Sequence, residues 1–245
     1  MKKKVNLSIE LKNVTKKYTI SHEKPTFIEN ILKRGYKEKF TALKKISLKI
    51  NKGEKIGIVG SNGAGKTTLL KVITGITEPT SGKVSLFGKI SSLIDLEAGF
   101  HPDLTGEENI FINGMLIGMK KSEIKKSYKK IVEFAELGSF IDAPLYTYSQ
   151  GMKLRLGFSV AAFSDPDIFI LDEGIYVGDD YFQAKCDKKI NEFLKQNKTI
   201  ILVSHWLPFL KSHAKRFIWV DKGRIREDGK YKVVKNYLNS KNKKN

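Results

Sequence analysis

Cysteine is almost absent from this chain of 245 residues, since Cys186 is the only one. A single cysteine excludes an internal disulfide and a site built from several thiolates, and it suits a reducing compartment. Long apolar runs are also lacking. No stretch approaches the roughly 18 residues that a membrane span requires, and no apolar leader segment follows the first four residues. We therefore expect a soluble chain.

Acidic residues are scarce relative to basic ones. The chain has 26 Asp and Glu against 45 Lys and Arg, which gives a formal net charge of +19. Such an excess favours polyanionic partners: nucleic acid, anionic lipid headgroups or a nucleotide. The lysines are spread along the whole chain, however, and a solvated basic surface explains them equally well. Charge alone does not choose between these partners.

The most informative segment that is present fits the P-loop pattern G-x-x-x-x-G-K-[ST]. It consists of Gly60, Ser61, Asn62, Gly63, Ala64, Gly65, Lys66, Thr67 and Thr68. In such loops backbone N–H groups surround phosphates, the lysine reaches the β and γ oxygens, and the Ser/Thr hydroxyl binds Mg²⁺. A short apolar run at 55–59 precedes the loop, and residues 67–74 have helical spacing. Strand, loop and helix follow in the required order.

The remaining periodicities predict an α/β fold, and with the P-loop this pattern resembles a P-loop NTPase core of RecA-like type. Alternating residues at 9–11 and 46–50 predict an antiparallel β edge, and buried strands are predicted at 168–171 and 199–204. Helices are predicted at about 107–118, 122–137 and 150–163, with a capping box from Thr105 to Glu108. We expect one domain over 1–245, in which a helical subdomain at about 97–163 is inserted.

The connection from Ile20 to Thr41 is longer than an ordinary hairpin loop. Within it, four apolar residues fall on one face of a short amphipathic helix: Phe27, Ile28, Ile31 and Leu32. Packing against the chain's own sheet explains that face, and so does docking to a partner or a membrane surface.

Polar side chains follow the predicted strands at the edge where parallel sheets bind ligands. Asp172 and Glu173 close the apolar run 168–171. In P-loop NTPases an Asp at this place holds Mg²⁺ together with the P-loop hydroxyl, here Thr67, and a neighbouring acid activates the attacking water. His205 ends the next strand and is a candidate donor to the γ-phosphate. Tyr18 is a candidate for stacking on adenine, with plain packing as the equal alternative.

Together with these elements, the sequence Ser149-Gln150-Gly151 before a helix makes the chain resemble an ABC transporter nucleotide-binding subunit. The resemblance implies an ATPase that uses ATP and Mg²⁺ and whose two copies enclose two ATP molecules head to tail. Ser149, Gln150, Gly151 and Asp179 of one copy would then contact the ATP held by the other. A helix N-terminus that faces an anion is physically favourable.

The segments 148–159, 99–110 and 177–179 are similar to those of the subfamily that exports polysaccharides. The resemblance implies an ATPase on the cytoplasmic face of the bacterial cytoplasmic membrane. It would drive a polytopic permease that exports lipid-linked O-antigen, capsule or teichoic acid. ATPases of drug or lipid exporters are the alternative. A ribosome- or nucleic-acid-associated ABC ATPase is favoured only by the charge, so we expect no nucleic-acid partner.

Three departures from the family pattern are visible. The usual Gln of the loop that leads to the helical subdomain is missing, and Asp95 or Glu97 lies nearest its place. Gln150 stands where a small residue is usual, and Tyr176 stands where a Ser is usual.

Overall fold

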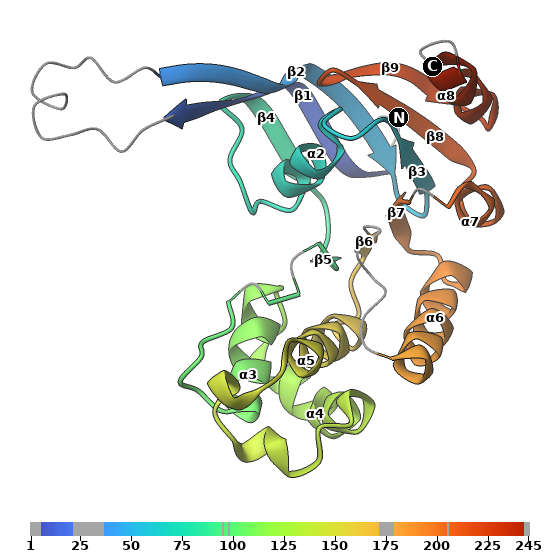
Figure 1. The fold of residues 1–245 in the computed structure, drawn as a ribbon. Helices are drawn as coiled ribbons and strands as arrows, with labels where there is room; N and C mark the ends of the chain where they lie inside the picture. The colour runs from blue at the N-terminus through green and yellow to red at the C-terminus, as the bar shows by residue number, and fades with distance from the viewer. Residues whose placement is uncertain are drawn as a thin grey trace, which may run out of the picture.

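The computed structural model describes residues 6–21, 37–94, 96–97, 99–171, 179–204 and 206–242. Two sheets and a group of helices make up this part of the chain (Figure 1). The sheets lie at one end of the molecule, and α3, α4 and α5 lie at the other. Among the described residues, no helix combines the length and the apolar character that crossing a membrane requires.

The larger sheet has six strands and contains the predicted parallel core. Its order is β5 (Ile90–Ser92), β6 (Ile168–Leu171), β7 (Thr199–Val203), β3 (Lys55–Val59), β8 (Arg216–Asp221) and β9 (Arg224–Gly229). Neighbouring strands are parallel, except that β9 runs antiparallel to β8. The α/β fold class is confirmed. The strands β8 and β9 and the helix that follows them were not predicted.

The smaller sheet is antiparallel, with the order β2 (Lys37–Asn51), β1 (Leu7–Ser21) and β4 (Ser81–Leu86). The predicted antiparallel edge is confirmed, but the predicted bounds of the 20–41 connection are wrong. Pairing of β1 with β2 continues through Tyr18↔Phe40 to Ser21↔Lys37. Backbone hydrogen bonds are sufficient to extend the two strands, although neither presents a regular apolar face there. The helix proposed around 27–32 lies outside the described residues.

Helices cover both faces of the six-stranded sheet. The helix α2 (Lys66–Ile73) packs between the two sheets, whereas α6 (Asp180–Lys195), α7 (Leu207–His213) and α8 (Lys232–Asn242) cover the opposite face. Side chains of β6 alternate accordingly. Ile168 and Ile170 pack in the core on the α2 side of the sheet, and Phe169 packs in the core beneath α6, α7 and α8.

The single cysteine, Cys186, is buried in α6, and burial raises the pKa of its thiol to about 12. The sulfur therefore stays a neutral thiol in the core.

Three helices form a separate layer: α3 (Gly106–Leu116), α4 (Lys121–Ala135) and α5 (Gln150–Ala162). Two short 3₁₀ helices, Gly138–Asp142 and Leu145–Thr147, connect α4 to α5. The layer has its own apolar core, which includes Ile110, Ile131 and Leu156. The predicted capping box is confirmed, because Thr105 accepts from the Glu108 backbone and Glu108 accepts from the Thr105 backbone. It defines the start of α3.

The helix α5 begins within the predicted family segment Ser149-Gln150-Gly151, so we call it the signature helix. It contacts the chain that leads into the helical layer. Gly157 lies so close to this segment that a Cβ placed on it would be 2.2 Å from the carbonyl oxygen of Leu96. We expect Gly157→Ala to lower the free energy of unfolding by about 1–3 kcal/mol, because backbone atoms must move apart. Urea denaturation followed by circular dichroism measures this change.

A glycine on the same helix provides the control for this prediction. A Cβ on Gly151 would meet only the Ser149 hydroxyl oxygen, at 3.9 Å. Gly151→Ala should leave the stability equal or slightly higher, since alanine favours helix over glycine by up to about 1 kcal/mol. Equal unfolding curves for the two variants would show that the backbone at Leu96 leaves room for a methyl group on residue 157.

Candidate nucleotide-binding site

The P-loop follows the central strand β3 and leads directly into α2. Gly63 has a φ of 73° and Gly65 a φ of 105°, a left-handed region that side chains rarely adopt. Gly65 is the N-cap of α2, whose first turn contains no acidic residue and no side-chain cap. The first N–H groups of a helix have no acceptor within it. They therefore form a ready site for an anion.

Lys66 places its ammonium group at the centre of this loop. Its Nζ donates to the carbonyl oxygens of Gly60, at 2.8 Å, and Ser61, at 3.2 Å. The residue is only 9% exposed. Burying a cation is costly unless it is paired or hydrogen-bonded. A buried ammonium beside open N–H donors gives the loop a strong preference for a multiply charged anion.

Segments from elsewhere in the chain hold the loop in place. The Gly223 N–H donates to the Ala64 carbonyl at 2.9 Å, and the Lys44 N–H donates to the Gly223 carbonyl at 2.8 Å. A Cβ on Gly65 would lie 2.8 Å from the carbonyl oxygen of Ala42. The loop therefore has a preformed shape. Sequence reasoning missed Gly223, although Asp221-Lys222-Gly223 carries the composition of a hairpin turn.

The second predicted segment lies at the start of α5. Ser149 is the N-cap, and its hydroxyl oxygen accepts from the Met152 N–H at 3.2 Å. Ser149 and Gln150 are exposed, and the space beside Gly151 is open. The side chain of Gln150 donates to the carboxylate of Glu97. Glu97 thus contacts the signature helix, while Asp95 lies outside the described residues.

Asp179 begins α6 and is bound on both of its oxygens. One oxygen accepts from the Phe182 N–H at 2.9 Å, which caps the helix, and the other accepts from Arg155 at 2.7 Å. Arg155 belongs to α5 and also lies 4.0 Å from Glu136 at the end of α4. These contacts join three helices next to the signature segment. Arg155 was not predicted as part of the site, because nothing local in the sequence distinguishes it.

Comparison with protein families gives a match to the ABC transporter model over residues 43–175, more than half of the chain. This chain belongs to the ABC transporter family. The matched range contains both the P-loop and the segment Ser149-Gln150-Gly151.

Similar ABC proteins are known from several bacteria. An O-antigen export system ATP-binding protein of Myxococcus xanthus is 47% identical, over 91% of this chain and 53% of its own length. Its Klebsiella pneumoniae counterpart is 42% identical, over 90% of this chain and 93% of its own length. A teichoic acids export ATP-binding protein of Listeria innocua is 42% identical, over 94% of this chain and 69% of its own length. This chain thus spans about half of the first relative and nearly all of the second.

Solved structures support the fold of this ABC ATPase. A dimeric bacterial ABC transporter cassette has a TM-score of 0.65 and 26% identity, covering 91% of this chain and 98% of the cassette. A dimeric cassette in a post-hydrolysis state, bound to ADP and phosphate, has a TM-score of 0.68 and 24% identity, with the same coverage. The predicted P-loop NTPase fold with an antiparallel edge and a helical subdomain is confirmed.

Several predicted site residues of this ABC ATPase lie outside the described residues: Asp172, Glu173 and His205. The strands β6 and β7, which precede these positions in the sequence, run parallel to β3 and end at the same edge of the sheet. The roles of the three residues stay predictions. Within the described residues, no group of three or more Asp, Glu, His or Cys side chains is placed to hold a metal ion.

Tyr18 lies on β1 beside the part of β2 that contacts the P-loop. It pairs with Phe40, and Lys16 of the same strand pairs with Leu43, next to Gly65. Tyr18 is 37% exposed, and the ammonium of Lys16 lies 5.1 Å from its ring centroid. An exposed aromatic near the loop fits the predicted stacking on adenine. Phe40, which is also exposed, is a second aromatic that the sequence analysis missed.

The residues present fit the phosphate groups of ATP. The loop offers open helix N–H groups, a buried ammonium and no acidic side chain. Thr67 is exposed on the first turn of α2, so its hydroxyl is accessible to a metal ion held at the phosphates. The described residues thus fit an anion site, and Thr67 is the one predicted Mg²⁺ ligand among them.

Proposed function

We propose that this chain is the ATP-hydrolysing subunit of an ABC exporter for a lipid-linked polysaccharide such as O-antigen, capsule or teichoic acid. The observation that carries the proposal is the match, over nine-tenths or more of the chain, to relatives named for O-antigen and teichoic acid export. The proposed unit is one nucleotide-binding domain over 1–245, with a helical subdomain at about 97–163.

In this proposal the P-loop, residues 60–68, binds the phosphates of ATP, and Tyr18 stacks on adenine. Thr67 and Asp172 hold Mg²⁺, which would neutralise charge that develops on the phosphates. Glu173 accepts a proton from the attacking water, and His205 donates a hydrogen bond to the γ-phosphate. The buried Lys66 supports this arrangement, because its charge already lies within the loop.

A second copy of the chain completes each site. We propose that Ser149, Gln150 and Gly151 approach the γ-phosphate held by the other copy, with the N-terminus of α5 directed at it. The exposure of Ser149 and Gln150 and the open space beside Gly151 support this role. Asp179 lies at the same interface with its side chain 61% exposed, and its bond to Arg155 orients it relative to α5.

A polytopic permease is the proposed membrane partner, and an apolar groove supports its docking. The groove has a volume of about 430 Å³ and lies between the end of α2, β5 and the helices α3 and α5. Ile76 and Leu116 line it and are both exposed. Exposed apolar patches of this kind mark interaction sites. Binding there would hold the ATPase at the cytoplasmic face of the membrane as a peripheral subunit.

The test is purification of the tagged Glu173→Gln chain from native membranes with ATP and Mg²⁺. The substitution should block hydrolysis and retain ATP, which keeps the two copies together. We expect mass spectrometry to find a polytopic permease together with an undecaprenyl-linked glycan. A permease that carries a drug or another lipid would overturn the polysaccharide assignment. Ribosomes or DNA without a permease would overturn the transport function altogether.

A further inference from the structure

A second hollow on the surface, on the other side of α3, has an acidic rim. Its volume is about 640 Å³. Glu107, Glu108 and Asp142 line it, and Lys121 is the one cation among the described residues that do so. The chain as a whole has 45 basic and 26 acidic residues. Acidic residues therefore outnumber basic ones in the lining of this hollow, whereas basic residues outnumber acidic ones in the chain as a whole. We refer to this feature as the acidic groove.

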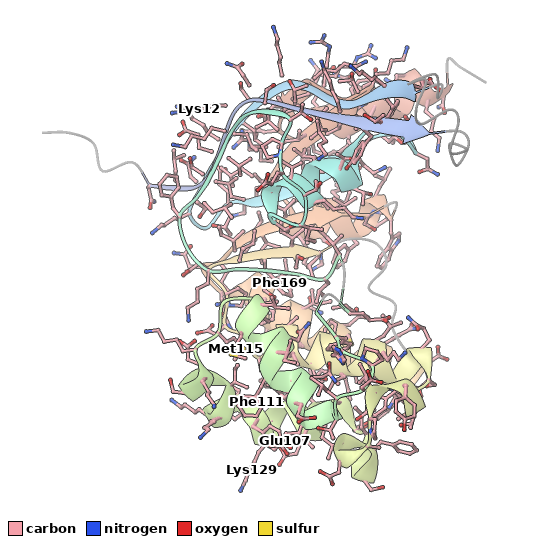
Figure 2. All side chains as sticks on the ribbon, turned by 90° about the vertical axis from the view of Figure 1, so that its left-hand side faces the viewer. Lys12, Glu107, Phe111, Met115, Lys129 and Phe169 are labelled. Carbon is pink, nitrogen blue, oxygen red and sulfur yellow. The ribbon has the colours of Figure 1, made fainter. Side chains whose placement is uncertain are left out.

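The apolar part of the lining, which we call the groove floor, follows one face of α3. Figure 2 shows Glu107, Phe111 and Met115 in succession along the helix, at a spacing of four residues. Residues four apart lie on one face of a helix. Met115 is 50% exposed, and the ring of Phe111 stacks against Tyr128 of α4, with centroids 6.3 Å apart. The groove therefore offers apolar contact area between charged edges.

The carboxylates on the rim are held in position. Glu107 accepts from the Tyr128 hydroxyl at 3.1 Å, and Glu108 accepts from the Thr105 N–H at 2.9 Å. Burial raises the pKa of Tyr128 to about 12, and the negative charges of Glu107 and Asp142 add to the effect. The Tyr128 hydroxyl therefore keeps its proton and stays a hydrogen-bond donor to Glu107.

We infer that the acidic groove binds a Lys/Arg-rich cytoplasmic segment of the membrane partner, with apolar side chains of that segment on the groove floor. This inference rests on the proposed function. Cytoplasmic loops of membrane proteins carry an excess of Lys and Arg near their spans. A chain with a net charge of +19 repels such a segment over most of its surface. At the acidic groove, the carboxylates of Glu107, Glu108 and Asp142 would instead attract the basic side chains of the segment.

The position of the groove supports the same partner. Met115 lines the acidic groove, and the next residue, Leu116, lines the apolar groove assigned above to the permease. One helix, α3, thus separates the two surfaces. A permease element in the apolar groove therefore brings its flanking basic residues within reach of Glu107 and Asp142.

The first test uses the full chain and a defined probe. The probe is a fluorescein-labelled amphipathic peptide of about 14 Leu and Lys residues, with four-residue spacing of Leu. Its counterpart has Glu in place of Lys. We expect the Lys peptide to bind despite the positive charge of the chain, with an affinity that falls as salt is added. Failure of the Lys peptide to bind would overturn the inference.

Variants locate the binding. Glu107→Lys should weaken binding of the Lys peptide about tenfold, because a like charge replaces an opposite one. Glu133→Lys is the matched control: it makes the same change at an exposed acid of the same helical layer, outside the groove. Met115→Ala should also weaken binding through lost apolar contact. Equal affinities of the Glu107→Lys and Glu133→Lys chains would overturn the inference. Thermal unfolding of each variant checks that the fold is kept.

The second test uses the complex in its native membrane. A photoreactive benzoylphenylalanine replaces Met115 in one strain and Ile76, in the apolar groove, in another. We expect position 115 to cross-link to a Lys/Arg-rich cytoplasmic segment of a polytopic protein. A permease adduct from position 76 alone would overturn the inference and leave the proposed function intact. The absence of a polytopic protein from both positions would overturn both.

Discussion

Lys66→Ala is expected to reduce ATP hydrolysis by about 10²–10³-fold, the range seen when one donor to developing charge is removed. The Nζ of Lys66 lies 2.8 Å from the Gly60 carbonyl oxygen, so its charge is held within the loop that receives the phosphates. Stability of the free protein should change by only about 1 kcal/mol, since the lost hydrogen bonds are partly offset by relief from burying a cation. Steady-state phosphate release and thermal unfolding, measured on the same preparation, check both statements.

Lys71→Ala is the matched control for this prediction, because Lys71 lies in the last turn of the same helix. That variant should hydrolyse ATP at the normal rate. If Lys66→Ala keeps more than about a tenth of the activity, the lysine does not supply the charge stabilisation that such a donor provides.

Gly151→Asp should abolish hydrolysis while leaving the protein folded. The new side chain has open space around it and sits in the first turn of α5, where the helix dipole favours an anion by about 0.3–1 kcal/mol. The isolated chain should therefore be as stable as the parent or slightly more stable. In the proposed dimer the same carboxylate would face the γ-phosphate, and like-charge repulsion would prevent closure. Analytical ultracentrifugation with ATP, in the Glu173→Gln background, measures dimer formation directly.

Gly151→Ala is the control that separates the effect of added side-chain volume from the effect of added negative charge. It should weaken hydrolysis less than Gly151→Asp does, because it adds volume without repelling phosphate. Full activity and ATP-dependent dimerisation of Gly151→Asp would show that the start of α5 does not approach the nucleotide. An unfolded variant would contradict the open surroundings of Gly151.

The parts of the fold that follow from local rules were predictable. The P-loop depends on glycines at positions where φ is positive, and the start of α3 depends on a capping box within four residues. The buried strands β6 and β7 appear in the sequence as short apolar runs because both of their faces are covered. Each of these signals is contained in a segment of only a few residues.

The parts that depend on distant contacts were not predictable. The bond between Arg155 and Asp179 joins residues 24 apart, and that between Gln150 and Glu97 joins residues 53 apart. The far end of the β1–β2 pair carries the exposed Tyr18 and Phe40 instead of an alternating apolar face, so backbone pairing extends it without a sequence pattern. The strand β9 was missed because charged residues interrupt it, whereas β8 contains the uninterrupted apolar run 217–220, a signal of the same kind as those of β6 and β7.

The position of β3 sets a lower limit on how small a working fragment of this ATPase can be. The segment that matches the family ends at residue 175, yet both neighbours of β3 in the sheet, β7 and β8, come after it. A chain cut at that point would retain the phosphate-binding sequence but would expose the backbone of its central strand on both sides. Such a fragment should behave as an aggregation-prone peptide rather than an independent module. Truncation from the C-terminus therefore removes nucleotide binding long before it reaches the P-loop.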